Sequence, residues 1–341
     1  MARSDLLKKL FRGYKAGDNE LFLEAAREIV EEERKKAHVV LANDLTRILD
    51  NGRPVTAVDM ARALGPLPRD SDRGGELAEI LYPDRFLADL VLSEDQRTTI
   101  EEILREFRQW EVLEANGLRP RHKLLFCGPP GCGKTVTAEA LAGELGLPLL
   151  YVRFDAVVSS LLGETANNLR KVFDYASRGS WVVLFDEFDA IGRSRDDATE
   201  HGELKRVVNT FLQLLDRYRG QSLVIAATNF ERALDPALWR RFDEIIRFEK
   251  PDRAQIEALL RLRLTSFPWS SATLEAAASR LDGMTHAEVE RICLDVARRR
   301  ALSGGGLLTE ESFEQAIKRQ ERRQQALLRS RGTGLPTVDQ D

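Results

Sequence analysis

The stretch "HKLLFCGPPGCGKTVTAEALAGEL", His122 to Leu145, decides the fold of this chain. A short apolar run, a glycine-rich turn and a run of helix-forming residues predict a strand, a tight loop and a helix in that order. Gly128 to Thr135 fits the pattern G-x-x-x-x-G-K-[ST], and the flanking strand and helix supply the context that this pattern requires. The sequence therefore predicts a loop whose backbone N–H groups close around a phosphate at the helix N-terminus.

Two side chains at the end of this loop have defined parts in such a site. Lys134 is expected to reach the outer phosphates, and Thr135 offers a hydroxyl to magnesium. Cys132 lies inside the loop, where its oxidation would crowd a phosphate; the alternative is a small residue at a variable position. The residues expected to contact the phosphates and the rest of the ligand here are Gly128, Pro129, Pro130, Gly131, Cys132, Gly133, Lys134, Thr135 and Val136.

Strand and helix signals alternate through the middle of the chain. Strands are expected at "LLYVRF", "WVVLFDE", "SLVIAAT" and "EIIRF", which predicts an α/β fold with a parallel sheet covered by helices on both faces. Beyond Asp252 the strand signals stop and helical periodicity continues. The expected parts are a helical N-terminal domain with a linker (1–75), the α/β domain (76–248), a small all-helical domain (249–326) and a disordered tail (327–341).

Composition narrows the class of protein. The 341 residues are 43% apolar and 31% charged, with a net charge of −4, as in a globular protein without an overall basic field for nucleic acid. Cys127, Cys132 and Cys293 are odd in number and widely spread, which argues against a disulfide framework or a four-ligand zinc site. No apolar run reaches membrane-spanning length. We expect a cytoplasmic protein without a membrane anchor.

Polar residues end two of the expected strands. Asp186 and Glu187 close "VVLFDE", where Asp186 can hold magnesium, partly through water, and Glu187 can orient or deprotonate a water that attacks a phosphate. Exposed loop carboxylates are the alternative. Asn229 follows "VIAAT", where its amide can hold the same water from the far side or simply occupy a turn.

Two adjacent arginines, Arg240 and Arg241, stand in "ALDPALWRRFDE". Nearby carboxylates leave two interpretations open. The arginines either await a negative charge from elsewhere, or they are surface residues paired with Asp243 and Glu244.

Together these segments resemble the AAA family of ATPases over roughly Leu87 to Ala326. The motifs "GPPGCGKT", "VVLFDEFDAIG", "ELKRVVNTFLQLLD", "AATN" and "LDPALWRRFD" occur in the family's order. The resemblance implies a P-loop NTPase sheet, a helical lid domain, a hexameric ring, and ATP bound with Mg²⁺ between neighbouring subunits. It also implies that Arg240 and Arg241 act on the neighbour's γ-phosphate. The family more often has Pro-Gly between these arginines, so which of the two contacts the phosphate stays open.

The segment "DGMTHAEVERI", Asp282 to Ile292, resembles the family's second sensor in the lid. Ala287 matches the small residue of that motif. His286 stands where glycine is usual, which places it near the adenine or ribose; a packing residue with satisfied hydrogen bonds is the alternative.

Relatives that thread polypeptide carry an aromatic residue before a Gly-Glu pair in a pore loop. In "SSLLGETANNLRKVF" these positions hold Leu161 and Leu162. Leucine offers an apolar contact but lacks a flat aromatic face, which weakens the threading interpretation. The alternative is that both leucines pack against the sheet.

We therefore expect a homo-oligomeric ATPase ring, a hexamer by resemblance, that disassembles or unfolds a protein partner. The sequence has no HExxH zinc motif, so proteolysis would need a partner. Some bacterial proteins that resemble this chain, with a single AAA module behind a short helical N-terminal domain, act with a separate serine protease, which makes such a protease a candidate partner. The alternatives are a nucleic-acid-associated switch or loader and an ATP-controlled regulatory module without threading. The N-terminal helices are expected to be an adaptor or a cap on the ring.

Overall fold

The structure is a computed structural model that describes residues 4–16, 18–35, 42, 45, 49, 65–70, 74–157, 162–188, 198–229, 239–304 and 306–332. The chain divides into two compact units. The first, here the sheet unit, comprises Met1–Ala88, Glu94–Gly128 and Lys134–Arg247. The second, here the lid unit, comprises Asp89–Ser93, Pro129–Gly133 and Phe248–Asp341.

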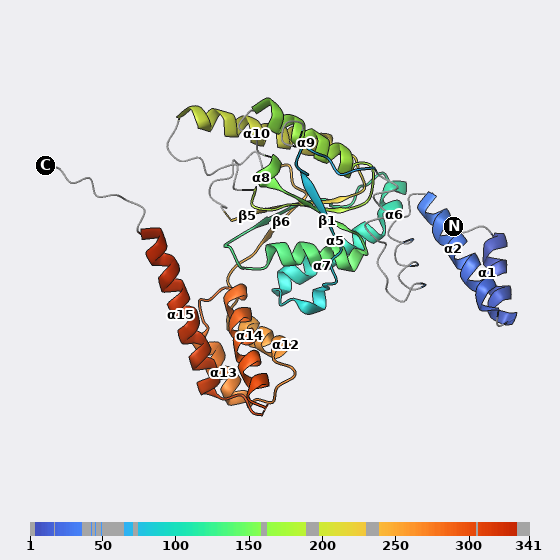
Figure 1. Cartoon of the computed structure of the whole chain (residues 1–341). Helices are drawn as coiled ribbons and strands as arrows, with labels where there is room; N and C mark the ends of the chain where they lie inside the picture. The colour runs from blue at the N-terminus through green and yellow to red at the C-terminus, as the bar shows by residue number, and fades with distance from the viewer. Residues whose placement is uncertain are drawn as a thin grey trace. The chain divides into compact units, whose positions relative to one another are not determined.

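A six-stranded, mostly parallel sheet forms the core of the sheet unit, in the order β1-β3-β4-β5-β2-β6 (Figure 1). The strands are β1 (Ala78–Leu81), β2 (Lys123–Cys127), β3 (Leu149–Val152), β4 (Val182–Phe185), β5 (Leu223–Thr228) and β6 (Glu244–Arg247). The expected α/β fold with a parallel sheet is confirmed. Because parallel strands end at the same edge, the residues that follow β2, β4 and β5 gather there.

Helices cover both faces of the sheet, as Figure 1 shows. The described helical segments between residues 74 and 229 include η1 (Leu87–Asp89), α5 (Glu94–Arg108), α6 (Trp110–Ala115), α7 (Lys134–Leu145), α8 (Phe154–Val157), α9 (Leu162–Ala176) and α10 (Ala198–Arg217). Alternate strand residues such as Leu125, Val183 and Phe185 pack in one cluster with α9 and α10. Leu124 and Phe126 are buried on the face opposite to Leu125, and α7 contacts β4 and β5. Both faces are therefore dry, which explains the near-continuous apolar strands.

Strand β1 was missing from the sequence prediction. It is the outermost strand of the sheet on one side and runs antiparallel to β3, with Ala78 opposite Val152 and Leu81 opposite Leu149. Its four residues, AEIL, are too few and too mixed in polarity to give a periodic signal.

The lid unit is built on helices α12 (Arg253–Arg263), α13 (Ser271–Arg280), α14 (His286–Leu302) and α15 (Glu310–Gly332). Asp252 and Thr285 begin α12 and α14 with complete capping boxes, and Ser270 caps α13. An apolar cluster that includes Ile256 and Val296 joins these helices. Helix α15 continues past Ala326, where the sequence analysis ended the helical domain, and residues 333–341 lie outside the described residues.

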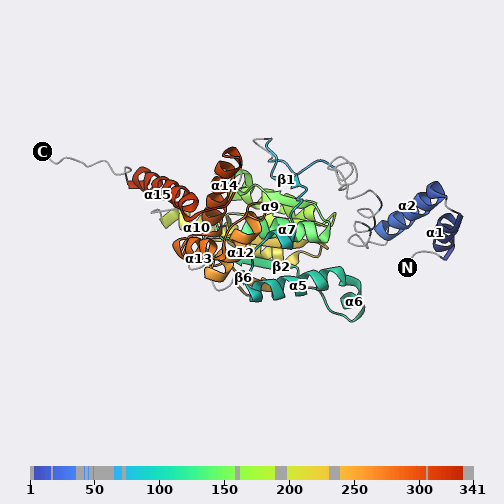
Figure 2. The same ribbon diagram turned by 90° about the horizontal axis from the view of Figure 1, so that it is seen from below.

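The N-terminal helices α1 (Ser4–Ala16) and α2 (Asn19–Lys35) pack side by side as a hairpin in both views (Figures 1 and 2). None of the described helices is sufficiently long and apolar for a membrane span. The three cysteines are buried and carry free thiols.

Candidate functional site

The phosphate loop joins the end of β2 to the start of α7 and turns on three glycines. Gly128, Gly131 and Gly133 have φ angles of 139°, 77° and 103°, in the region that side chains disfavour. A chain bent in this way can point successive backbone N–H groups toward an anion.

Lys134 is the first residue of α7, and only 6% of it is exposed. A buried ammonium group must be paired, and its Nζ donates a hydrogen bond of 2.6 Å to the carbonyl oxygen of Gly128. The lysine side chain therefore folds back along the loop, with its charge beside the start of the turn.

Thr135 and Asp186 link the phosphate loop to β4. The Thr135 hydroxyl donates to Asp186 Oδ2 at 2.7 Å, and the backbone N–H of Glu187 donates to Asp186 Oδ1 at 2.8 Å. Both carboxylate oxygens are thus oriented. A hydroxyl and a carboxylate held together are the oxygen ligands that Mg²⁺ prefers, so this pair fits a magnesium nucleotide.

Glu187 combines an exposed side chain with an unusual backbone. Its φ is 51°, the only positive φ of a non-glycine residue among the described parts of the chain. Residues in such left-handed conformations carry strain and concentrate at functional sites. The strained residue thus lies two positions after the end of β4, next to Asp186.

Asn229 follows β5 at the same edge of the sheet. Strands β2 and β5 are parallel, with Cys127 opposite Thr228, and the Gly128 N–H donates to the Thr228 carbonyl at 3.3 Å. The backbone of Asn229 therefore lies next to Gly128, the first residue of the phosphate loop. The strand ends bring Asn229, Asp186 and Gly128 to the same end of the sheet.

Arg240 and Arg241 do not pair with the carboxylates that the sequence analysis considered. Arg241 Nε donates to Asp216 Oδ2 at 2.8 Å, whereas Arg240 is exposed. Asp243 Oδ2 instead accepts the backbone N–H groups of residues 122 and 123, both at 3.0 Å. The interpretation that both arginines pair with Asp243 and Glu244 is therefore wrong, because backbone amides bind the one carboxylate and Arg121 binds the other.

The partner of Glu244 is Arg121, whose Nη1 donates to its carboxylate at 2.8 Å. Arg121 also pairs with Glu102 and Glu106. Burial would raise the pKa of Glu106, but the hydrogen bonds from Arg121 outweigh burial and the pKa falls below its usual value. This network joins α5 to the start of β6, just after the arginines.

Arg240 and Arg241 lie at the opposite edge of the sheet from the phosphate loop of their own chain. Strands β2 and β6 are parallel, with Leu124 opposite Glu244 and Cys127 opposite Arg247. The arginines precede β6, whereas the phosphate loop follows β2. The length of a strand therefore separates them, at about 3.3 Å per residue.

Within the lid unit, the start of α14 contacts the phosphate loop. The Ala287 N–H donates to the Gly131 carbonyl at 3.0 Å. A Cβ added at Gly131 would lie 3.1 Å from Thr285 Oγ1 and 3.3 Å from Ala287 Cβ. The sequence analysis missed Thr285, although the Thr-x-x-Glu capping box that contains it was visible.

His286 does not have the satisfied hydrogen bonds of the packing alternative. Both ring nitrogens are buried and make no hydrogen bond in the structure. Burial lowers the pKa of His286, and the charge of Glu290 offsets only part of this effect. The imidazole is therefore neutral near pH 7. Because both nitrogens are buried, a ligand could hydrogen-bond to them only after a neighbouring group moves.

The pore-loop residues cannot be placed. Leu161 lies outside the described residues, and Leu162 begins α9 without a described side chain.

Comparisons with known proteins place this arrangement in context. Residues 124–250 match the family model described as ATPase family associated with various cellular activities (AAA). The AAA family ATPase y4kL of Sinorhizobium fredii is 41% identical over 323 residues, which cover 95% of this chain and 97% of that protein.

The ATP-dependent zinc metalloprotease FtsH 3 of Sphaerobacter thermophilus is 35% identical over 269 residues, 77% of this chain and 54% of that protein. FtsH of Corynebacterium glutamicum is 34% identical over 260 residues, 72% of this chain and 30% of that protein. The chain thus matches y4kL along nearly its whole length, but only about half or less of these FtsH proteins.

Proposed function

The chain belongs to the AAA family of ATPases, and from this premise we propose that it works as a homo-oligomeric ring that remodels a protein partner. The family hydrolyses ATP to ADP and phosphate. A hexamer, Mg²⁺ as the metal and a cytoplasmic location are parts of the proposal. The observation that carries it is the position of the two arginines at the sheet edge opposite their own phosphate loop.

The roles of the site residues follow from their positions. Lys134 and the loop N–H groups bind the phosphates, and Thr135 with Asp186 holds Mg²⁺, which when bound neutralises phosphate oxygens. Glu187 orients and deprotonates the attacking water, and Asn229 holds this water from the neighbouring strand end. Gly128 to Val136 surround the phosphates, and His286 with Ala287 lies toward the adenine or ribose.

An arginine at the far edge of the sheet cannot reach the γ-phosphate of its own chain. In a ring, Arg240 and Arg241 of one subunit would approach the nucleotide of the next, and such a residue is worth about 10³- to 10⁵-fold in phosphoryl transfer. The geometry therefore supports hydrolysis at subunit interfaces and little hydrolysis by a lone subunit.

Mixing two inactive variants tests this arrangement. Glu187→Gln removes the base but keeps the arginines, while Arg240→Ala with Arg241→Ala removes the arginines but keeps the base. In the mixture, an interface between a Glu187→Gln site and the arginine-free neighbour stays inactive. An interface in which the arginine variant supplies Glu187 and the Glu187→Gln subunit supplies the arginines has both groups. ATP turnover should reappear in the mixture, and a mixture as inactive as its components would overturn the proposed shared site.

The remodelling role rests on the FtsH proteins, whose names specify ATP-dependent proteases. Their zinc protease activity is not proposed here, because the printed sequence contains no HExxH motif. A separate serine protease is a proposed partner. The leucines at the pore positions favour a second candidate, a regulatory ring that binds a partner with ATP and releases it on hydrolysis.

Capture of the partner tests the remodelling role. Glu187→Gln chains with ATP and Mg²⁺ should retain a specific protein, and Lys134→Ala chains should not. Nuclease-sensitive nucleic acid in place of protein would favour a loader. Replacing Leu161 and Leu162 by alanine separates the other candidates. With threading, unfolding of the captured protein should fail while ATP turnover persists, whereas a switch should still bind and release its partner as the wild type does.

A further inference from the structure

The N-terminal hairpin has a fixed internal geometry. Its turn is closed by the Asp18 N–H, which donates to the Gly13 carbonyl at 3.0 Å, and Asp18 Oδ1 accepts the Leu21 N–H at 3.0 Å. Lys9 of α1 pairs with Glu24 and Glu28 of α2 at 3.2 and 2.9 Å. Lysine–glutamate pairing thus already joins the two helices within one chain.

The outer face of α1 is apolar along one stripe and cationic beside it. Leu7, Phe11 and Tyr14 are 43%, 67% and 78% exposed, and their spacing of four and three residues puts them on one line. The cationic stripe consists of the exposed residues Lys8, Arg12 and Lys15, which make no ion pair within the described chain. Three large apolar side chains and three free cations therefore face solvent together.

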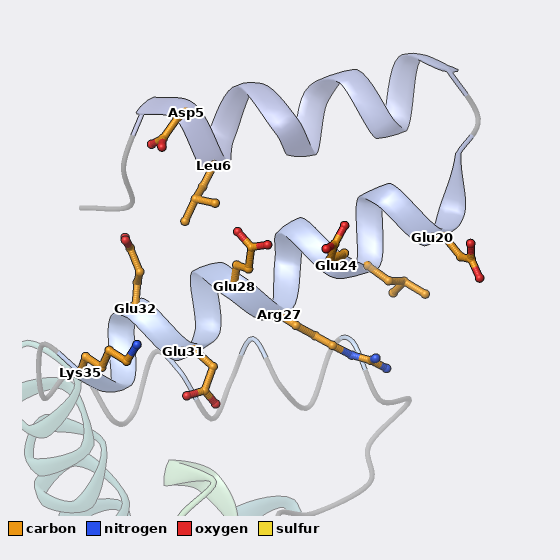
Figure 3. Close-up of a pocket in the computed structure, with 10 residues that line it drawn as sticks. Asp5, Leu6, Glu20, Glu24, Arg27, Glu28, Glu31, Glu32 and Lys35 are labelled. Carbon is orange, nitrogen blue, oxygen red and sulfur yellow. The ribbon is translucent and has the colours of Figure 1, made fainter.

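The other feature of the hairpin is an acidic groove of about 580 Å³, shown in Figure 3. Its lining has six carboxylates, two cations and two leucines: Asp5, Leu6, Glu20, Leu23, Glu24, Arg27, Glu28, Glu31, Glu32 and Lys35. None of the six residues of the outer face of α1 lines this groove, so the two surfaces are separate.

We propose that the outer face of α1 docks into the acidic groove of the hairpin of a second copy of this chain. Lys8, Arg12 and Lys15 meet carboxylates, while the apolar stripe covers Leu6 and Leu23. An anionic lipid surface would attract the same cations but repel the six carboxylates of the groove, so charge favours a second copy.

The two docking surfaces differ, so each copy offers one to each neighbour. Such head-to-tail contacts close into rings or extend as filaments. That these contacts close into a ring, and do not extend as a filament, rests on the proposed function. The hairpin contact adds to that ring an interaction between subunits that needs no nucleotide.

Zero-length coupling of amines to carboxylates tests the contact in the full chain. Isotope-labelled and unlabelled copies are mixed, so that mass spectrometry separates links between copies from links within one copy. We expect links between copies from Lys8 or Lys15 to Glu20, Glu24 or Glu31. Links within single copies only would overturn the inference.

Charge reversal then tests specificity. One variant carries Lys8→Glu, Arg12→Glu and Lys15→Glu, and the other carries Glu20→Lys and Glu31→Lys; Lys9, Glu24 and Glu28 stay because they pair within the hairpin. The α2 variant, which keeps Lys8, Lys15 and Glu24 for coupling, should alone lose links between copies at least tenfold, and a mixture of the two variants should regain them. Circular dichroism and ATP turnover check that both variants fold.

Unchanged yields in the α2 variant alone, or no recovery in the mixture, would overturn the contact. So would α1 reversal that releases the chain from phosphatidylserine vesicles, combined with a mixture of variants that regains no links between copies, because lipid would then be the occupant. Sedimentation of Glu187→Gln with ATP reports separately on the proposed ring. A chain that forms no closed ring there, yet gives nucleotide-independent links between hairpins, would contradict the ring and keep this inference.

Discussion

The Thr135 hydroxyl donates a 2.7 Å hydrogen bond to Asp186 Oδ2 and so ties the start of α7 to the end of β4. The second carboxylate oxygen is held by the Glu187 N–H at 2.8 Å. Both oxygens of the Asp186 carboxylate are thus held in place, so the pair is preorganised for the Mg²⁺ that we propose it binds.

Thr135→Val is therefore expected to raise the Mg²⁺ concentration needed for half-maximal ATP turnover by about 10- to 100-fold. Valine keeps the shape of threonine but removes both the metal ligand and the hydrogen bond to Asp186. Thr135→Ser restores the hydroxyl and should stay near wild type. A Mg²⁺ titration of ATP turnover measures both, and equal titration curves for valine and serine would contradict the assignment.

Glu187 should show that function and stability conflict at this position. Both Glu187→Gln and Glu187→Gly remove the base, so each should lower ATP turnover by about 10²- to 10⁴-fold. Glycine also relieves the φ of 51°. Strain relief of about 1–2 kcal/mol exceeds the entropic cost of glycine, about 0.5–1 kcal/mol, so the glycine variant should unfold at the higher temperature. Calorimetry on the two variants compares them, and a less stable glycine variant would argue against strain.

The sequence predicted the site best where function depends on chain order. The turn after β2, the carboxylates after β4 and the amide after β5 come together because parallel strands share one edge, and each strand was visible as an apolar run. Strand β1 and the partner of Arg241 were not predictable in this way. Asp216 lies at the end of α10, and only the folded geometry brings it to Arg241.

Gly131 and Gly283 form a matched pair for the contact between the phosphate loop and α14. Both have positive φ, 77° and 75°, but a Cβ at Gly131 would press on Thr285 and Ala287, whereas a Cβ at Gly283 would meet no atom of the described residues within 4 Å. Gly283→Ala should cost about 1 kcal/mol of stability, from backbone strain alone. Gly131→Ala should cost about 1 kcal/mol more, since the Ala287 hydrogen bond is also disturbed.

Gly131→Ala should in addition weaken ATP binding, which a fluorescent nucleotide titration measures. Gly283→Ala serves as the control and should bind normally. Equal affinity for the two variants would mean that the contact does not shape the phosphate loop.

The two arginines should differ in their effect on hydrolysis. Arg240 is exposed, whereas Arg241 is held by Asp216 through Nε. We expect Arg240→Ala to lower kcat of the assembled protein by about 10³-fold with unchanged ATP affinity, and Arg241→Ala to lower it less. Asp216→Asn, which loosens Arg241 alone, should resemble Arg241→Ala. A larger loss for Arg241→Ala than for Arg240→Ala would reverse the assignment.

His286 should make the protein less stable in mild acid. Burial lowers its pKa in the folded chain, although Glu290 pulls the other way, while the unfolded chain protonates near pH 6.5. Below about pH 6.5 the unfolded state therefore binds more protons than the folded state. The free energy of unfolding consequently decreases as the pH is lowered. Above about pH 6.5 His286 is neutral in both states and no longer lowers the free energy of unfolding.

His286→Leu removes both the titrating group and the two buried ring nitrogens that lack hydrogen bonds. Relative to the wild type, the variant should gain stability between about pH 6.5 and pH 5. His122, whose pKa burial also lowers, keeps part of the acid sensitivity in both proteins. Urea unfolding at a series of pH values measures the difference. Parallel curves for the two proteins would show that His286 is not a buried neutral imidazole, because only a group with different folded and unfolded pKa values changes the slope.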